Sequence, residues 1–417
     1  MKLVKSKKGK SFLFFLLLCS VSFILSACWS AKELHNLAII NAMGIDLNDK
    51  GDYEVTVVIP KPSALFSQPF VGDIGGDRRN NYLIETASGK TIFEAMGNLS
   101  KSIVENIYFG HVDVVVFGEK VAKEKMESSL DFFHRNIQFR PNTQLLVSKE
   151  KASDVVSISP EYNTTFGLEI LDLIKSNRLT TTKMIRDMSQ FKKEFNQDTT
   201  DPITAVVTNA ENIGNKVIDE DANSKKEQEK RTDIVSLNGT AVFKEENLKG
   251  YLNHSETRGL LWIKGELKKE IVVLECGENE KGFVSVIIND SSSKMIPEIN
   301  QIYNKITVIT NVDARIGEVT CTNLKLNSNQ LNQLNKQMEE LIVKEEKDVL
   351  NKVQKQWQAD IFGFGKAFYQ KHPRDWDRIA SNWRKGGLKD LQVHLKVNAN
   401  ISQYGLRKST GQANESR

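Results

Sequence analysis

The sequence contains little cysteine and little proline, and beyond its first 27 residues it has no long apolar run. Only 4 Cys and 8 Pro occur in 417 residues, which excludes a disulfide-dense scaffold and a collagen-like or proline-rich repeat. No downstream stretch approaches about 18 consecutive apolar residues, so a second membrane segment is not expected. Apolar residues make up 40% of the chain, enough to fill a core, and the length predicts about two to four domains.

Motifs for metal binding and covalent catalysis are missing as well. The six histidines occur singly, without an HxxxH, HExxH or CxxC companion, and the chain has no GxSxG. The sequence therefore predicts no catalytic residue, no metal site and no cofactor, and a protein that is not an enzyme. A pair of carboxylates for glycoside hydrolysis requires a folded pocket before it can be assessed. The histidines are His35, His111, His134, His254, His372 and His394.

Positive charge is in slight excess, with 57 Lys and Arg against 53 Asp and Glu and a formal net charge of +4. Five of the lysines lie in the first 27 residues, which contain no acid, so the remaining chain has 52 basic and 53 acidic residues. Nucleic-acid binding needs a concentrated basic face. We therefore expect no nucleic-acid partner.

The N-terminus has the form of a bacterial lipoprotein signal. Its lysines precede an apolar and small-residue run at 12–25, which reaches only about 21 Å as a helix and is too short to span a bilayer. The sequence LSAC at residues 25–28 then fits a lipobox. We expect residues 1–27 to be cleaved after Ala27 and Cys28 to carry diacylglycerol on its thiol, which anchors the protein without a membrane span. The alternative is an ordinary cleavage site with a chance cysteine.

Two cysteines remain once Cys19 leaves with the signal peptide and Cys28 is acylated. Cys276 and Cys321 each lie in a strand-like stretch, and a compartment outside the cytoplasm permits oxidation. The sequence gives no distance between the two side chains. We expect two separate buried thiols, with a disulfide as the alternative.

The chain after residue 27 predicts an α+β fold of three domains, each a mixed or antiparallel sheet packed with helices. Residues 28–198 form the N-terminal domain, and residues 53–60 should bury one face of a strand. A glycine-rich loop is expected at 62–81. The predicted strands of this domain are 37–47, 53–60, 82–86, 112–117 and 144–147, and its helices begin at 91 and cover 121–133, 166–175 and 181–191.

A small middle domain is expected at 199–260 and a C-terminal domain at 261–417. The middle domain contains a charged, solvated loop at 215–233, and Gly239 marks a bulge or a close backbone approach. The C-terminal domain contains a long amphipathic helix at 328–359, whose apolar stripe is interrupted only by Glu345. The predicted strands are 204–209, 235–243, 270–274, 283–288, 306–312, 317–324 and 391–401, with a break at 289–293.

Two local patterns resemble binding motifs. The sequence SGKT at 88–91 imitates the end of a phosphate-binding loop, but residue 84 is Ile84 where the first glycine should be, so we expect a turn and a helix cap. Aromatic and basic residues alternate between 360 and 385. This pattern occurs in single-strand nucleic-acid binders; we favour a packed helical corner with cations at its rim, and a partner-binding surface is a third interpretation.

Several blocks, in order along the chain, resemble the Ger(x)C family, the lipoprotein C subunits of nutrient germinant receptors in endospore-forming bacteria. The resemblance covers most of residues 28–405 and departs at the charged segment 215–233. The blocks are 28–29 (CW), 33–39 (ELHNLAI), 44–46 (GID), 108–111 (YFGH), 237–244 (LNGTAVFK), 256–265 (ETRGLLWIKG) and 360–373 (DIFGFGKAFYQKHP), with Trp376 and Trp383.

The resemblance implies a three-domain α+β protein without known catalysis, held by its lipid on the outer face of the spore inner membrane. It also implies assembly with an A subunit and an integral-membrane B subunit, in a receptor that starts germination in response to nutrients. A solute-binding lipoprotein that captures a small nutrient is the alternative, and a secreted hydrolase is a weaker one. The ligand-binding residues are not indicated.

Overall fold

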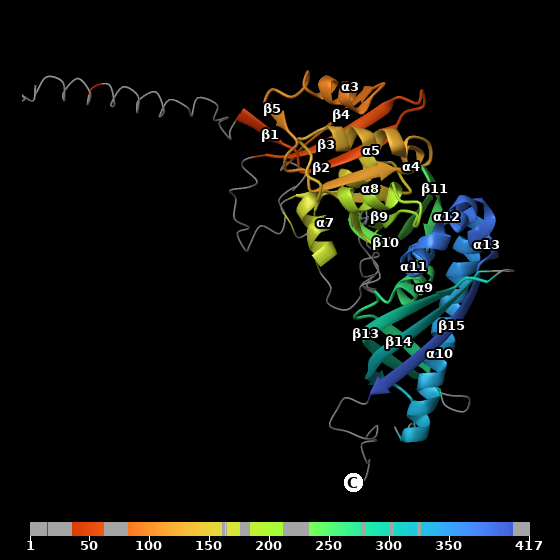
Figure 1. The fold of residues 1–417 in the computed structure, drawn as a ribbon. Coiled ribbons are helices and arrows are strands. Elements are labelled where there is room, and N and C mark those ends of the chain that lie inside the picture. The colour runs from red at the N-terminus through yellow and green to blue at the C-terminus, as the bar shows by residue number, and fades with distance from the viewer. Residues whose placement is uncertain are drawn as a thin grey trace, which may run out of the picture.

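The structure is a computed structural model, and it contains two bodies that lie one above the other in Figure 1. It describes Phe15 and residues 36–61, 82–160, 163, 165–175, 184–211, 233–276, 281–300, 304–322 and 327–402. The first body is built on a nine-stranded sheet, and the second on a four-stranded sheet packed on a long helix. This mixture of helices and sheets confirms the expected α+β class.

The nine-stranded sheet has the order β11-β10-β9-β7-β6-β2-β3-β4, with the short β8 paired to β7 beside this path. Its four central strands β9, β7, β6 and β2 are parallel, and the outer strands on both sides are antiparallel. A separate parallel pair joins β1 (Leu37–Ile39) to β5 (Asn106–Tyr108). The sheet strands are β2 (Ala42–Leu47), β3 (Tyr53–Pro60), β4 (Tyr82–Gly89), β6 (Val114–Gly118), β7 (Gln144–Ser148), β8 (Arg186–Asp187), β9 (Ile203–Glu211), β10 (Asp233–Lys244) and β11 (Asn247–Leu252).

Helices cover both faces of this sheet. The wholly buried β6 shows the reason, because Val115 and Phe117 point into one core and Val114 and Val116 into the other. The first core lies under α3 (Ile92–Leu99), α4 (Glu119–Glu124), α5 (Met126–Arg135) and α8 (Met188–Phe195), and the second under α6 (Ala152–Val156) and α7 (Phe166–Lys175).

The second body has the strand order β12-β13-β14-β15, and its last strand returns parallel to β14 after the helical segment. The long α10 packs against β15 and against α9. Its elements are α9 (His254–Lys264), β12 (Ile271–Glu275), β13 (Phe283–Glu298), β14 (Lys305–Val319), α10 (Ser328–Leu350), the π-helix η4 (Asn351–Trp357), α11 (Phe364–Lys371), α12 (Pro373–Asn382), the π-helix η5 (Trp383–Gly387), α13 (Leu388–Asp390) and β15 (Gln392–Ser402).

Two predicted interruptions of this sheet are wrong. β13 continues through residues 289–293, because an irregularity between Ile288 and Asp290 absorbs the polar cluster and the Ser291 hydroxyl donates to the Leu267 carbonyl at 2.8 Å. β14 likewise continues through residues 313–316, so the predicted strands 306–312 and 317–324 are one strand that ends at Val319.

Two predicted helices of the first body also differ. The helix expected at 121–133 is divided at Lys125, whose φ of −140° is not helical. Of the helix expected at 181–191, residues 181–183 lie outside the described residues, and residues 186–187 form β8. Asp187 then caps α8, since its carboxylate accepts the Gln190 N–H at 2.7 Å.

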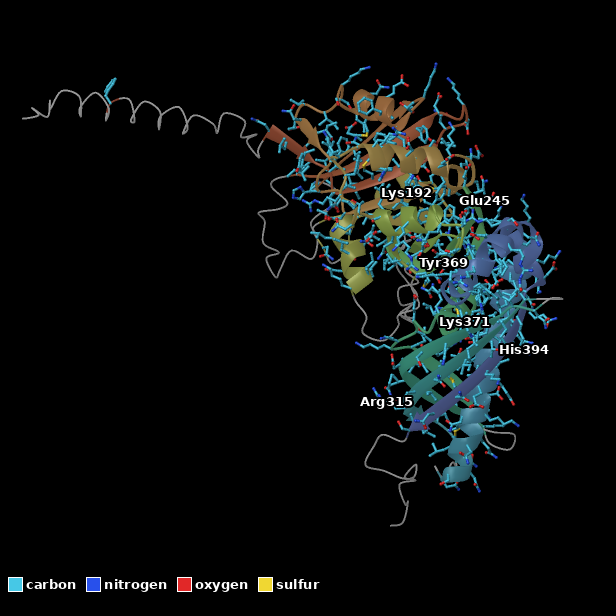
Figure 2. The ribbon with its side chains drawn as sticks, viewed as in Figure 1. Lys192, Glu245, Arg315, Tyr369, Lys371 and His394 are labelled. Carbon is cyan, nitrogen blue, oxygen red and sulfur yellow. A yellow bond between two sulfur atoms is a disulfide. The ribbon has the colours of Figure 1, made fainter. Side chains whose placement is uncertain are left out.

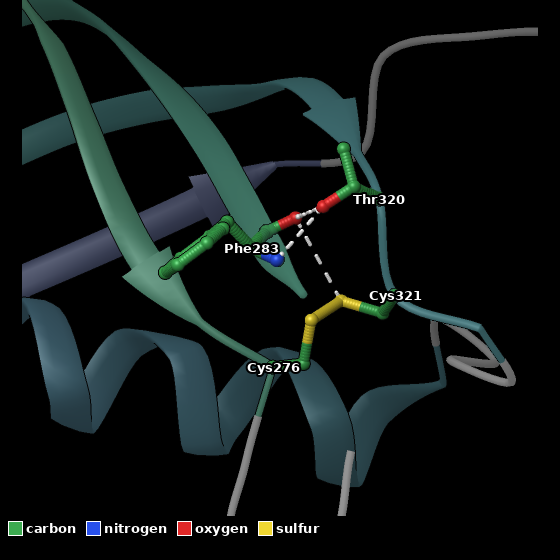
Figure 3. Close-up of a disulfide and its surroundings, with 4 residues drawn as sticks. All are labelled: Cys276, Phe283, Thr320 and Cys321. Carbon is green, nitrogen blue, oxygen red and sulfur yellow. Dashed lines mark hydrogen bonds between the residues drawn. A yellow bond between two sulfur atoms is a disulfide. The ribbon is translucent and has the colours of Figure 1, made fainter. Parts of the chain in front are cut away.

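The expectation of two separate thiols is wrong, because Cys276 and Cys321 form a disulfide (Figure 3). The bond joins the end of β12 to the residues after β14. Beside it the Phe283 N–H donates to the Thr320 hydroxyl at 2.8 Å, and the Thr320 N–H donates to the Phe283 carbonyl at 2.9 Å. The sheet brings together two cysteines that are 45 residues apart.

The proposed boundary between residues 198 and 199 precedes a strand of the large sheet. β9 pairs with β7 in parallel, and β10 and β11 extend the sheet from there. The division into three domains stays a prediction. The loop at 62–81 and residues 215–232 lie outside the described residues, and Asp233 is the first residue of β10.

Candidate functional site

The two residues assigned to processing and lipidation, Ala27 and Cys28, lie outside the described residues. β1 begins at Leu37, and nine residues of extended chain reach about 30 Å. β1 and its partner β5 therefore lie within about 30 Å of Cys28. Among the described residues, no helix is long and apolar enough to cross a membrane.

The local binding-motif candidates have structural roles. Thr91 caps α3, because its hydroxyl accepts the Glu94 N–H at 3.1 Å, so the predicted helix cap is confirmed. The predicted turn is shorter than expected, because Ser88 and Gly89 belong to β4. No three His, Cys, Asp or Glu side chains gather into a group that could hold a metal ion within the part of the chain that the structure describes. The His372 ring lies 3.3 Å from the Pro297 carbonyl oxygen.

Asp360 organises the start of the aromatic corner from a fully buried position. Its carboxylate accepts the backbone N–H groups of Gly363, Phe364 and Gly365 at 2.9, 3.0 and 2.6 Å, and the Trp383 indole N–H at 3.1 Å. Burial raises the pKa of Asp360 to about 6, while these donors oppose the shift. The carboxylate is therefore a cap for α11 that fixes Trp383 behind it.

Asp201 connects this corner to the first body. Its carboxylate accepts the Asp360 N–H at 2.6 Å, and its own N–H donates to the Asp360 carbonyl at 2.8 Å. Arg384 lies 3.7 Å from the same carboxylate and donates to the Gln197 carbonyl at 2.6 Å. Burial raises the pKa of Asp201. The carboxylates of Asp201 and Asp360 are buried at the junction of the bodies and accept hydrogen bonds from backbone N–H groups. This arrangement does not favour the hydrolase alternative, which requires two carboxylates in a pocket that a substrate can enter.

The aromatic residues of the corner form a core. Phe368, Trp376 and Trp383 are buried, and the rings of Phe368 and Trp376 each lie 5.6 Å from that of Trp383. A Cβ on Gly365 would lie 2.8 Å from the Thr199 carbonyl oxygen, which explains the glycine there. The packed helical corner is confirmed, and these rings are not available to stack on bases.

Glu345, the single lapse in the apolar stripe of the long helix, binds α9. The carboxylate accepts bonds from the Arg258 guanidinium and from the Trp262 indole N–H, the latter at 3.0 Å. The helices approach closely beside this contact, because a Cβ on Gly259 would lie 2.4 Å from the Glu345 carbonyl oxygen. A second ion pair, between Lys352 and Glu256 at 2.7 Å, joins α9 to η4, which follows α10 directly.

A cleft of about 830 Å³ lies between the two bodies. In Figure 2 the labelled Lys371 lies at the level where the bodies meet. Lysines reach this cleft from α8 on one side and from β13 and α11 on the other. It is lined by Arg186, Gln190, Lys193, Glu194, Gln197, Thr200, Lys264, Glu266, Ser293, Lys294, Met295, Pro297, Phe362, Gly363, Lys366, Ala367, Gln370 and Lys371.

A groove of about 900 Å³ with a mixed apolar and polar lining lies on the first body between α3, α5 and β5. Phe93 and Ile137 are 70% and 97% exposed on its rim, and Val104 is exposed just before β5. Phe109 and Phe132 line the interior. Exposed apolar side chains that gather around a groove mark an interaction surface.

Neither the cleft nor the groove was predicted from the sequence, because each is lined by segments that are distant in the chain. The cleft combines residues 186–200 with residues 264–297 and 362–371. The only sequence feature that indicated the cleft is the set of cations at the rim of the aromatic corner. Of these, Lys366 and Lys371 line the cleft. The groove combines α3 with α5, and the exposed Ile137 and Phe93 carry no periodic signal of their own.

Family models match the chain over most of its length. Residues 30–209 match the model described as Spore germination protein N-terminal domain, and residues 238–405 match Spore germination B3/GerAC like, C-terminal. The chain belongs to the Ger(x)C family of spore germination proteins. The resemblance read from the blocks of sequence is thereby confirmed.

Relatives of this Ger(x)C chain match it from end to end. It is 29% identical to Spore germination protein KC of Bacillus subtilis (strain 168), over 95% of this chain and 97% of the relative. It is 23% identical to Putative spore germination protein YfkR of the same organism, over 94% and 95%. Its fold is similar to the crystal structure of the GerBC protein, with a TM-score of 0.53 and 15% identity over 86% of this chain and 96% of that one.

The blocks that identify the Ger(x)C family hold elements together in this structure. Asp46 accepts the N–H groups of Ala152 and Ser153, at 2.9 and 2.8 Å, at the start of α6. Gly239 has a φ of +87° at an irregularity of β10, which confirms the bulge expected there. The blocks at 256–265 and 360–373 supply the α9–α10 contact and the junction. Several residues of these blocks therefore also specify the fold.

Proposed function

We propose that this protein is a non-enzymatic, lipid-anchored subunit of a nutrient germinant receptor, held by Cys28 on the outer face of the spore inner membrane. Membership of a family whose relatives are named spore germination proteins, along almost the whole chain, supports the germination role. The lipobox supports the anchor. In this proposal the folded bodies hold or couple an A subunit and an integral-membrane B subunit.

The groove on the first body, with its exposed Phe93 and Ile137, is the contact that we assign to the membrane-bound partner. It adjoins β5, which pairs with β1, and β1 starts nine residues after Cys28. An anchor this short keeps the groove close to the bilayer, where an integral subunit presents apolar segments. The concave shape favours an inserted apolar segment of that subunit over a flat lipid surface.

The anchor is tested with Cys28→Ala. The variant should leave the membrane fraction of spores, because alanine has no thiol to carry the diacylglycerol that anchors the mature chain. Retention equal to that of the wild type would contradict the anchor.

The groove is tested with Phe93→Ser combined with Ile137→Ser. This variant should stay in the membrane through its lipid but lose crosslinks to the integral subunit, because the exposed apolar contacts are removed. The matched control is Val273→Ser combined with Phe283→Ser, two exposed apolar residues of the second body. Equal crosslinking by both double variants and the wild type would exclude the groove as the contact.

The cleft between the bodies favours one second candidate, the capture of a small nutrient. A solute-binding lipoprotein needs a hollow between domains with polar groups that fix the ligand, and Gln190, Thr200 and Gln370 are such groups here. Calorimetry with amino acids, sugars and nucleosides tests it. Saturable binding of a nutrient would favour this candidate, and no heat with any of them would remove it.

A further inference from the structure

We propose that the cleft between the two bodies binds a small-molecule polyanion that carries carboxylate or phosphate groups. This inference does not rest on the receptor proposal. It rests on the charges that line the cleft, on the elements that supply them and on the cleft's position.

The charges in the cleft are predominantly positive. Six cations line it, and each of its two carboxylates already has one of them as an ion-pair partner. Glu194 pairs with Arg186 at 2.8 Å, and Glu266 lies 3.6 Å from Lys264. The other four cations form no ion pair with any residue that the structure describes. They are Lys193, Lys294, Lys366 and Lys371.

These four lysines come from both bodies. Lys193 belongs to α8 of the first body, Lys294 to β13, and Lys366 and Lys371 to one end and the other of α11. All four are exposed. Because they face one hollow, their fields add there, and the low-dielectric walls of a cleft concentrate such a field. A ligand with two or more negative charges relieves the repulsion between them, whereas a neutral ligand does not.

Uncharged groups in the cleft suit the same ligand. Gln190, Gln370 and Thr200 offer hydrogen-bond donors. The volume of about 830 Å³ lies in the range of small-molecule sites.

The experiment titrates the full-length protein in detergent with citrate and, separately, with pyrophosphate, by isothermal calorimetry at low and high salt. We expect saturable binding of at least one probe, weakened by salt because the contacts are ionic. The two probes distinguish a carboxylate ligand from a phosphate ligand. Absence of saturable binding by both would overturn the inference.

Charge-removing variants locate the site. Lys366→Gln with Lys371→Gln should weaken binding about a hundredfold, since a hydrogen bond to a charged group is worth about tenfold in affinity. Lys193→Gln, across the cleft, should weaken it about tenfold. Lys396→Gln removes one positive charge, as Lys193→Gln does, but from exposed β15 outside the cleft. It should have no effect on binding.

Two outcomes of the variants would count against the cleft. Equal weakening by Lys396→Gln would assign the binding to overall charge. Loss in the α11 double variant without loss in Lys193→Gln would assign it to the surface of the second body alone. Unchanged near-ultraviolet circular dichroism confirms that each variant is folded. If citrate binds only weakly and an acidic peptide displaces it, the ligand of the cleft is an acidic protein segment and the small-molecule inference is overturned.

Discussion

Removing the disulfide should destabilise the second body by about 4 kcal/mol. The bond between Cys276 and Cys321 closes a loop across 45 residues, and the entropy of that loop in the unfolded chain sets the magnitude in the chain-entropy model. With a urea dependence of about 2 kcal/mol/M, Cys276→Ser combined with Cys321→Ser should lower the unfolding midpoint by about 2 M. The variant should be less stable because its unfolded chain, without the bond, has more conformational entropy.

Tryptophan fluorescence is the appropriate assay, because the tryptophans among the described residues lie in the second body. They are Trp262, Trp357, Trp376 and Trp383. The chain from residue 29 onward should be unfolded in urea, so that the signal cysteine and the acylated cysteine are both absent. Wild-type chain in dithiothreitol is the control and should have the midpoint of the double variant. Alkylation of both thiols in the native, unreduced chain would refute the reasoning, as would equal midpoints.

Two buried carboxylates of α10 give further predictions. Burial raises the pKa of Glu346 to about 7 from 4.5, so its ionised form opposes folding, and stability falls as pH rises from about 4.5 through about 7. Glu346→Gln should be up to about 3 kcal/mol more stable than the wild type at pH 8 and equal to it below pH 4.5; urea unfolding at both pH values measures this, and a constant difference would contradict it. Glu345→Ala leaves Arg258 and Trp262 without their acceptor and should cost about 3–5 kcal/mol; thermal unfolding measures it, and Glu340→Ala on the exposed face is the control.

Patterns confined to one element were predicted well from the sequence. The alternation in β3 buries Tyr53, Val55 and Val57 in one core, as expected. The continuous apolar run of β6 is buried throughout, and the stripe of the long helix faces the core of the second body. The alternation did not predict that β3 is buried on its other face too, where Val58 lies in the core under α6 and α7.

The errors arise where a distant partner decides the outcome. The polar cluster at 289–293 predicts a turn, but β14 pairs with it along its length and keeps it extended. Glu345 is a defect in a stripe until Arg258, 87 residues away, is placed beside it. The disulfide depends in the same way on a distance that the chain alone does not give. The cleft and the groove belong to this class, because their walls come from separate segments.

The contacts between the two bodies differ in how they resist movement. At the junction, Asp360 accepts four N–H donors and is itself tied to Asp201. Separating the bodies there would leave buried groups without partners, at a cost of about 1–3 kcal/mol for each. In the cleft beside this junction, Lys193 of the first body and Lys366 of the second body are both positively charged. No hydrogen bond of the described chain joins these two side chains. The junction therefore resists separation through its buried hydrogen bonds, and a polyanion in the cleft would add ionic contacts to both bodies.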